Sequence, residues 1–218
     1  MSGLWDDWLT YDAVLLDALG AAVKLAAATL ALGLPLGLVL AVTTTSRRRL
    51  VRLVTIAAVE IGRGTPALIM LQIVYVGLPD VGLTFGAFVA ATLALALTTA
   101  AYSSEIIRGG LQAVPAGEVE AGDALGMSRR DVLRFVVIPQ GLRIALPPLL
   151  GFMIIMFQAT SLAYSISYQE LTATAKSVAS REFNALNMFI LAGLLYAAVT
   201  IPASWLSDRV DRRLSRHL

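Results

Sequence analysis

Three groups of polar side chains interrupt apolar segments of this chain, and they are the residues best suited to contact a polar solute. Glu60 and Arg63 lie three residues apart, as do Glu105 and Arg108, so each pair shares one helical face and can form an ion pair. An ionisable side chain inside an apolar helix is costly unless it faces protein or a water-filled cavity. Each pair therefore predicts either part of a polar path or a structural ion pair that braces a neighbouring bend or loop.

The backbone next to the first pair is predicted to bend. Gly62, Gly64 and Pro66 all weaken a helix, and Thr65 lies directly before the proline. A bend at this point would suit a gate or a curved lining.

The third polar group lies near the middle of a later apolar segment. It comprises Gln158, Thr160 and Ser161, followed by Tyr164. These side chains could contact a solute, but serine and threonine in membrane helices often bond to the carbonyl of the preceding turn. Both interpretations stay open.

The elements that carry these residues are predicted to be membrane-spanning helices. The chain has 218 residues, of which 57% are hydrophobic, and its mean hydropathy is +0.76. Soluble domains are about 45–50% apolar, and a helix needs about 20 apolar residues to cross a bilayer. We expect five such spans in one all-α domain over residues 1–218, at about 13–42, 53–78, 83–107, 144–166 and 186–206.

Composition excludes several function classes. The chain has no cysteine and one histidine, His217, so it lacks material for a disulfide framework, a cysteine metal site or a histidine-based catalytic centre. It has no G-x-x-x-x-G-K-[ST] phosphate loop. Its arginines cluster at membrane boundaries without interleaved aromatics, which argues against nucleic-acid binding.

A hydrophilic loop at 114–140 separates the third and fourth spans. Pro115 and Pro139 bracket it, Gly126 can take the left-handed conformation that ends a helix, and Ser128 with Asp131 forms a capping-box-like start. We predict two short helices at about 116–125 and 129–137, joined by a bend and lying in water between spans.

The distribution of arginine predicts the orientation of the chain. With five spans, the first loop, the 114–140 loop and the C-terminus share one side, and nearly all arginines fall there. The opposite side has Lys176 and Arg181 as its only basic residues, together with several acids. By the positive-inside rule the N-terminus is outside and the C-terminus is cytoplasmic.

The hydrophilic loop resembles the EAA loop of bacterial ABC-importer permeases. Glu120-Ala121-Gly122, then Gly126, then Val136-Val137-Ile138-Pro139 match the E-A-A, G and I-x-L-P consensus in register. In that family the first loop helix docks in a cleft of a separate ATPase. The resemblance implies coupling roles for Glu118, Glu120, Ala121, Gly122, Leu125, Gly126 and Pro139.

Three further stretches resemble the histidine/glutamine-type subfamily, which handles polar amino acids. Arg63-Gly64-Thr65-Pro66, closed by Gly77-Leu78-Pro79, is similar to its R-G-T-P…G-L-P signature, and the stretch from Ala101 to Gly110 to its A-A-Y-x-x-E-I-x-R-G-G. Thr160-Ser161-Leu162 is similar to K-D-T-S-L, but Gln158 and Ala159 replace the charged pair. That departure weakens the case for a cationic substrate. The implied substrate path contains Glu60, Arg63, Thr65, Pro66, Glu105, Gln158, Thr160, Ser161 and Tyr164.

The resemblance implies a type I ABC importer fold in the bacterial inner membrane, with this chain as a permease rather than an enzyme. The implied partners are a second permease chain, identical or homologous, two ATPase subunits that hold ATP and Mg, and an extracytoplasmic solute-binding protein. That binding protein could contact the polar segment 167–184, which could equally be an amphipathic interfacial helix. No cofactor is expected on this chain.

Two alternatives remain open from sequence alone. One is ABC uptake of an amino-acid-like compatible solute such as ectoine. The other is an ion-driven secondary transporter or channel, which would favour an isolated carboxylate relay rather than the two glutamates that each have an arginine one turn away.

Overall fold

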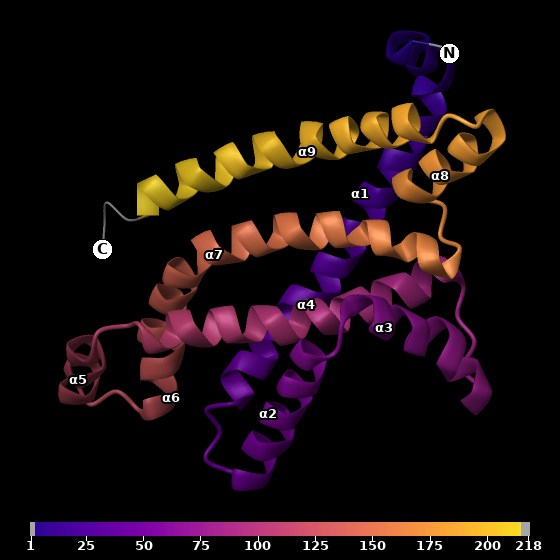
Figure 1. The fold of residues 1–218 in the computed structure, drawn as a ribbon. Helices are drawn as coiled ribbons and strands as arrows, with labels where there is room; N and C mark the ends of the chain where they lie inside the picture. Colours follow the sequence, from indigo (N-terminus) through magenta and orange to yellow (C-terminus); the bar gives the residue numbers. More distant parts are fainter. Residues whose placement is uncertain (1–2, 215–218) are drawn as a thin grey trace.

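The computed structural model describes residues 3–214, and within that range every regular element is a helix, as predicted. Four helices are long and apolar enough to span a membrane, namely α1 (Leu4–Thr43), α4 (Ala87–Gln112), α7 (Ile138–Ala159, continued at both ends) and α9 (Ala185–Leu214). The shorter elements are α2 (Arg49–Gly64), α3 (Ala67–Gln72), α5 (Ala116–Ala124), α6 (Arg129–Asp131) and α8 (Leu171–Glu182). In Figure 1, α4, α7 and α9 run side by side while α1 crosses them.

The remaining span is broken rather than continuous over 53–78. α2 ends at Gly64, and α3 with the turns that continue it to Val81 leaves at 103°. The break follows from sequence: Pro66 disfavours helical backbone at the preceding residue, and Thr65 is accordingly extended at φ −88°, ψ 124°. Five spans result when this bent pair counts as one.

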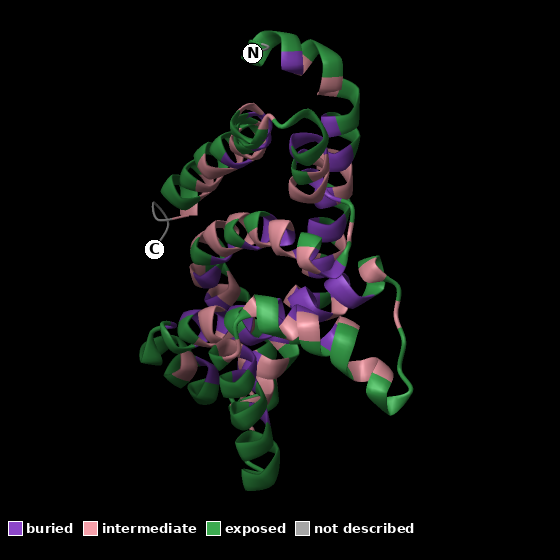
Figure 2. Ribbon diagram, turned by 45° about the vertical axis from the view of Figure 1, so that its right-hand side comes forward, coloured by how far each residue is buried: buried purple, intermediate pink, exposed green. Residues whose placement is uncertain are grey.

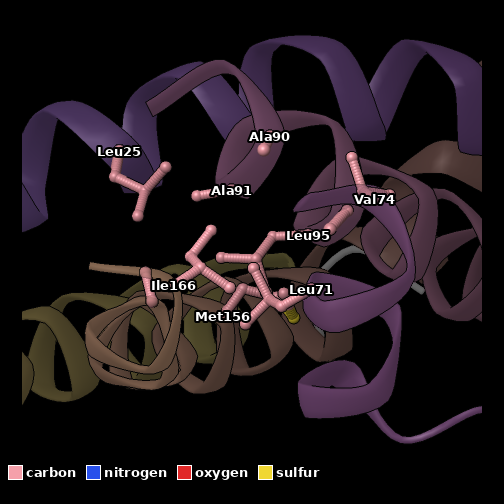
Figure 3. Packing of buried hydrophobic residues seen from close by; sticks show 10 residues of the cluster. Leu25, Leu71, Val74, Ala90, Ala91, Leu95, Met156 and Ile166 are labelled. Carbon is pink, nitrogen blue, oxygen red and sulfur yellow. The ribbon is translucent and has the colours of Figure 1, made fainter. Parts of the chain in front are cut away.

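α4 is the central helix of the molecule. Its most apolar stretch is 67% buried, against 22% for α9. In the largest core cluster Leu95 of α4 packs with Leu25 of α1, Leu71 of α3, Met156 of α7 and Ile166 of the 3₁₀ turn after α7 (Thr160–Ile166) (Figure 3).

Small residues bring α1 and α4 into close contact. A Cβ added at Gly33 would lie 2.5 Å from Cβ of Thr99, and one added at Gly37 would collide with Oγ of Ser103. The Thr99 hydroxyl donates to the Leu95 carbonyl at 2.7 Å, so its burial leaves no orphan polar group. Glycine at both α1 positions therefore sets the distance between the two helices.

The segment after α7 folds as an amphipathic helix, α8, on the side of the molecule that also holds the N-terminus (Figure 1). Leu171, Ala175 and Val178 are buried against α1 and α9, with Leu15 and Met188 in the same cluster. The opposite face carries exposed polar residues, and Figure 2 shows α8 divided between buried and exposed colours.

The hydrophilic loop contains one short helix rather than two separate ones. α5 occupies 116–124, Gly126 is left-handed at φ 73°, and the Ser128 hydroxyl accepts a hydrogen bond from the Asp131 N–H at 3.2 Å. The second predicted helix, however, continues through a π-helical turn (Val132–Val137) into α7, so Arg129–Ile166 reads as one span. Pro139 does not end it, because the proline falls in the first turn of α7, where a missing N–H is tolerated.

Candidate functional site

The break between α2 and α3 opens a cleft of about 500 Å³ against α4 and α7, hereafter the break cleft. Its lining includes Thr65 and Pro66, the two residues between the helices, whose backbone the helix break leaves outside any helix. The cleft is lined by Arg63, Gly64, Thr65, Pro66, Ala67, Thr98, Tyr102, Phe152, Ile155, Met156 and Ala159. Its size falls within the range of small-molecule sites, about 300–1,000 Å³.

Aromatic side chains form one wall of the break cleft. Tyr102 and Phe152 stack with ring centroids 5.8 Å apart and an interplanar angle of 23°. The guanidinium carbon of Arg63 lies 6.0 Å from the Tyr102 ring centroid. The Tyr102 hydroxyl also donates to the Arg63 carbonyl at 3.0 Å, which ties the last turn of α2 to α4. The arginine is thereby held at the mouth of the cleft.

Arg63 also belongs to a row of four alternating charges, hereafter the ion chain: Glu60, Arg63, Glu105 and Arg108. Arg63 Nη1 lies 3.4 Å from Glu60 Oε1 and 3.5 Å from Glu105 Oε2. Arg108 donates two shorter hydrogen bonds to Glu105, from Nε at 2.9 Å and from Nη2 at 2.6 Å. The two pairs expected from sequence thus both form, and the Arg63–Glu105 contact, which spacing could not indicate, joins them.

The ion chain leads from the break cleft toward the hydrophilic loop. A second cleft, of about 260 Å³, is lined by Glu60, Glu105, Arg108 and Gln112, together with the end of α1. Arg108 donates to Gln112 at 3.1 Å in the last turn of α4. Polar groups therefore continue from the break at Gly64 to the end of α4.

The break cleft suits a small solute that carries a carboxylate. Arg63 is the only charged residue in its lining, and among the described residues the lining contains no carboxylate. A guanidinium can bind a carboxylate with two parallel hydrogen bonds. The contacts of Arg63 with Glu60 and Glu105 are long, at 3.4 and 3.5 Å, and are therefore weak enough to be exchanged for such a ligand.

The structure does not gather the whole predicted path in one place. Arg63, Thr65 and Pro66 line the break cleft, and Glu60 and Glu105 line the second cleft. Gln158 is exposed but is not part of the break-cleft lining, to which its neighbour Ala159 contributes.

The remaining predicted residues lie in the 3₁₀ turn after α7. Thr160 is fully buried and donates to the Phe157 carbonyl at 2.6 Å, which is the backbone-bonding alternative. Ser161 is half-buried. Tyr164 is exposed, with Lys176 Nζ 5.0 Å from its ring centroid.

The hydrophilic loop presents an apolar tip on a braced base. Leu125 is 81% exposed at the bend, and Glu120 and Ala121 are exposed on α5. Gly122 is buried where α5 meets Val132, since an added Cβ would lie 2.9 Å from Val132 Cγ2. Across the base, Gln140 Nε2 donates to Glu118 Oε2 at 3.3 Å, and Pro139 is exposed. An exposed leucine on a braced helix is suited to insertion in a partner's cleft.

A buried carboxylate, Glu170, was placed by sequence reasoning on a polar outer surface, but it has no exposed surface. It caps α8 by accepting from the N–H groups of Thr172 (2.8 Å) and Ala173 (2.9 Å), and the Tyr196 hydroxyl donates to it at 2.8 Å. Burial raises the pKa of the Glu170 carboxyl, and these hydrogen bonds oppose the increase. A glutamate directly before a helical stretch was the available signal of a cap.

Comparisons with known proteins agree on one family. The model of the binding-protein-dependent transport system inner membrane component family matches residues 33–216. Octopine transport system permease protein OccM of Rhizobium radiobacter is 40% identical over 198 residues, covering 87% of this chain and 80% of that protein. Probable amino-acid ABC transporter permease protein YckA of Bacillus subtilis (strain 168) is 34% identical over 186 residues, 85% and 82% of the two chains.

A solved structure extends the likeness to three dimensions. The crystal structure of an amino acid ABC transporter with histidines contains a chain that superposes with a TM-score of 0.91 at 31% identity. The superposition covers 98% of this chain and 99% of that one.

Proposed function

The chain belongs to the family of binding-protein-dependent transport system inner membrane components and is the permease subunit of an amino acid ABC importer; on that premise, we propose how its parts divide the work. The break cleft receives the carboxylate of the solute at Arg63. The loop built on α5 couples the helices to ATP hydrolysis on separate subunits. An ion-driven secondary transporter is not favoured by these likenesses.

The solute assignment depends on the lining of the break cleft, in which Arg63 is the only charged residue among those described. Arg63 stands at a helix break beside an aromatic wall, in a lining with no carboxylate among the described residues. The ion chain as a whole has two acids and two bases, so a carboxylate that replaces a glutamate contact at Arg63 leaves the local charge balanced by the solute's ammonium group. A zwitterionic amino acid fits this charge pattern better than one with a net charge.

The coupling assignment is supported by the shape of the loop and by its side of the membrane. Leu125 and Glu120 project from a short helix whose base is fixed against Val132. The loop lies at the same end of the molecule as the C-terminal end of α9 (Figure 1), with its arginines. The positive-inside rule puts that end in the cytoplasm, where an ATPase binds. The N-terminus and α8 then face outward, toward a solute-binding protein.

The proposed cycle is a shift between inward- and outward-open states. ATPase subunits that bind the loop differently in their ATP and ADP states bias that equilibrium by the difference in binding free energy. Two copies of the permease, identical or homologous, enclose the path. The backbone departs from α-helix at the break after Gly64 and at the π-helical turn of residues 132–137, among other points, and these two could absorb the change.

The test is reconstitution of the importer purified from its own membrane through a tag on this chain. The preparation should contain an ATP-binding subunit, and proteoliposomes should take up labelled amino acid only with ATP and the binding protein. Solute accumulation by this chain alone, driven by a proton or sodium gradient, would refute the proposal.

A further inference from the structure

Beside the base of the loop lies a groove of about 670 Å³ between the ends of α1 and α4 and the start of the fourth span, hereafter the basic groove. Four arginines line it: Arg47, Arg108, Arg129 and Arg130. They come from three separate parts of the chain, and the lining contains no acidic residue. Only the fold brings these charges to one hollow.

Three of these four arginines form no ion pair with the described residues. Arg108 is neutralised by Glu105. Arg47, Arg129 and Arg130 are exposed, and none of them forms an ion pair within residues 3–214. The nearby Asp131 carboxylate instead accepts the Ser128 hydroxyl at 2.6 Å. The groove is therefore an electropositive hollow that an anion would complete.

Much of the remaining lining of the basic groove is aliphatic, although it also includes Thr43, Thr45, Ser46 and Gln112. Val42, Leu111, Leu133 and Val137 face it from the last turn of α1, the last turn of α4 and the first turns of the fourth span. Each of these segments is the point at which a membrane helix ends. A ligand that fills the groove must thus offer an anionic head and apolar chains at the depth of the membrane boundary.

We infer that the basic groove binds an anionic phospholipid of the cytoplasmic leaflet, with its phosphate among Arg47, Arg129 and Arg130 and its acyl chains along the aliphatic wall. Basic pockets between membrane helices on the cytoplasmic side are suited to such headgroups. The π-helical turn Val132–Val137 contributes Val132 and Leu133 to the wall of the groove, and Val132 also packs against Gly122 of α5. A bound lipid would therefore brace the base of the loop. The site does not depend on which amino acid the importer carries.

The experiment measures lipid retained by the intact importer. The complex is purified, exchanged into phosphatidylcholine, titrated with phosphatidylglycerol and examined by native mass spectrometry. The variant R47Q/R129Q/R130Q should bind phosphatidylglycerol on the order of 100-fold more weakly, since each arginine near an anionic headgroup contributes about fivefold. The control R48Q/R49Q/R52Q removes the same charge from exposed arginines of the same boundary that do not line the groove, and it should keep wild-type binding.

Three results would overturn the inference. Equal losses in the two triple variants would mean diffuse surface charge. Loss of the ATPase subunit with unchanged lipid binding would mean that the arginines serve a protein partner. Displacement of the lipid by millimolar inorganic phosphate would mean a free-anion site. Should the triple variant fail to assemble, R47Q alone, which lies outside the loop, should weaken binding about fivefold, and wild-type binding by R47Q would also refute the site.

Discussion

Glu170 is a fully buried carboxylate that joins two helices at the end of the molecule that holds α8. It caps α8 and accepts the Tyr196 hydroxyl of α9, so one side chain joins two helices. Removing it would strip the cap and leave a buried hydroxyl without its acceptor. Those losses cost about 1 kcal/mol and about 1–3 kcal/mol respectively.

We therefore predict that Glu170→Ala lowers the thermal stability of the purified permease by several degrees and that Glu170→Gln changes its pH dependence. The folded-state pKa of Glu170 is raised by burial. Stability from the protonated carboxyl is complete below the unfolded-state pKa, about 4.3, and is lost as pH rises through the folded value. Wild type should lose Tm relative to Glu170→Gln between pH 4 and pH 7. Parallel Tm profiles would show that the carboxyl does not titrate differently on folding.

Arg63 is the residue on which solute recognition should depend most. Arg63→Lys keeps the charge but loses the planar fork that binds a carboxylate at two points. We expect the KM for amino acid uptake to rise about 10–100-fold, the loss of one charge-assisted hydrogen bond of about 1.5–3 kcal/mol. Basal ATPase activity should stay close to wild type, because Arg63 lines the break cleft and the lysine keeps the positive charge that the ion chain needs.

Gln158→Ala is the matched comparison, since Gln158 was also predicted to contact the solute but lies outside the break-cleft lining. An unchanged KM is expected for it. A raised KM for Gln158→Ala together with a normal one for Arg63→Lys would move the solute site to the end of α7.

At the scale of elements, α4 and α7 pack through two glycines. A Cβ at Gly110 would collide with the Gly141 carbonyl oxygen and lie 2.8 Å from Ala145 Cβ, and a Cβ at Gly141 would lie 2.7 Å from Leu111 Cα. Gly109, the next residue of the same helix, has no heavy atom within 4 Å of the added carbon. The same glycine-to-alanine change can therefore be made at Gly109, where an added methyl group has space, and at Gly110, where it has none.

We predict opposite effects for alanine at these neighbours. Gly109→Ala should stabilise α4 by about 0.5–1 kcal/mol, the helix propensity difference. Gly110→Ala should destabilise the protein by about 1–3 kcal/mol, because it must push α7 away. Thermal unfolding in detergent measures both, and equal shifts would contradict the packing described.

The bend at Gly126 sets the direction of the chain after α5. Its φ of 73° is unfavourable for a side chain by about 1–2 kcal/mol, and most of all for a β-branched one. Gly126→Val should abolish solute-stimulated ATPase activity while membrane insertion stays normal, and Glu120→Arg should do the same by reversing an exposed charge on α5. Gly117→Ala, with open space around it in the same helix, is the control. Normal coupled uptake by both variants would count against the coupling role of the loop.

The elements show what sequence could predict here and why the rest escaped. The ion pairs Glu60–Arg63 and Glu105–Arg108 follow from helical spacing, and the bend at Pro66 from the stereochemistry of proline, so all three were predictable. The Arg63–Glu105 contact joins different helices, and its geometry depends on a 103° bend whose direction is set by packing.

The same limit applies to the end of the hydrophilic loop. Pro139 reads locally as a helix boundary, but the π-helical turn before it lets the helix continue. Likewise the polar composition around Glu170 suggests a solvent-exposed surface. In the fold that carboxylate is buried, and Tyr196 of α9 donates a hydrogen bond to it.

At the scale of the whole molecule, the proposed orientation can be measured directly because the chain has no cysteine. Ala124→Cys in α5 and Ser180→Cys in α8 place single thiols on exposed positions at opposite ends. In intact cells whose outer membrane has been permeabilised, a membrane-impermeant maleimide should label position 180 and not position 124. In inside-out vesicles it should label position 124 and not position 180. Labelling of position 124 from outside would refute both the orientation and the docking of a cytoplasmic ATPase.

The close contact of Gly33 and Gly37 with Thr99 and Ser103 opposes sliding of α1 past α4. We therefore expect these two helices to move together during transport. We expect movement of the loop to be taken up elsewhere, at Thr65–Pro66 and at the π-helical turn of residues 132–137, where the backbone departs from α-helix. Gly33→Ala should therefore force α1 away from α4 and impair transport, although Gly33 lines neither the break cleft nor the second cleft.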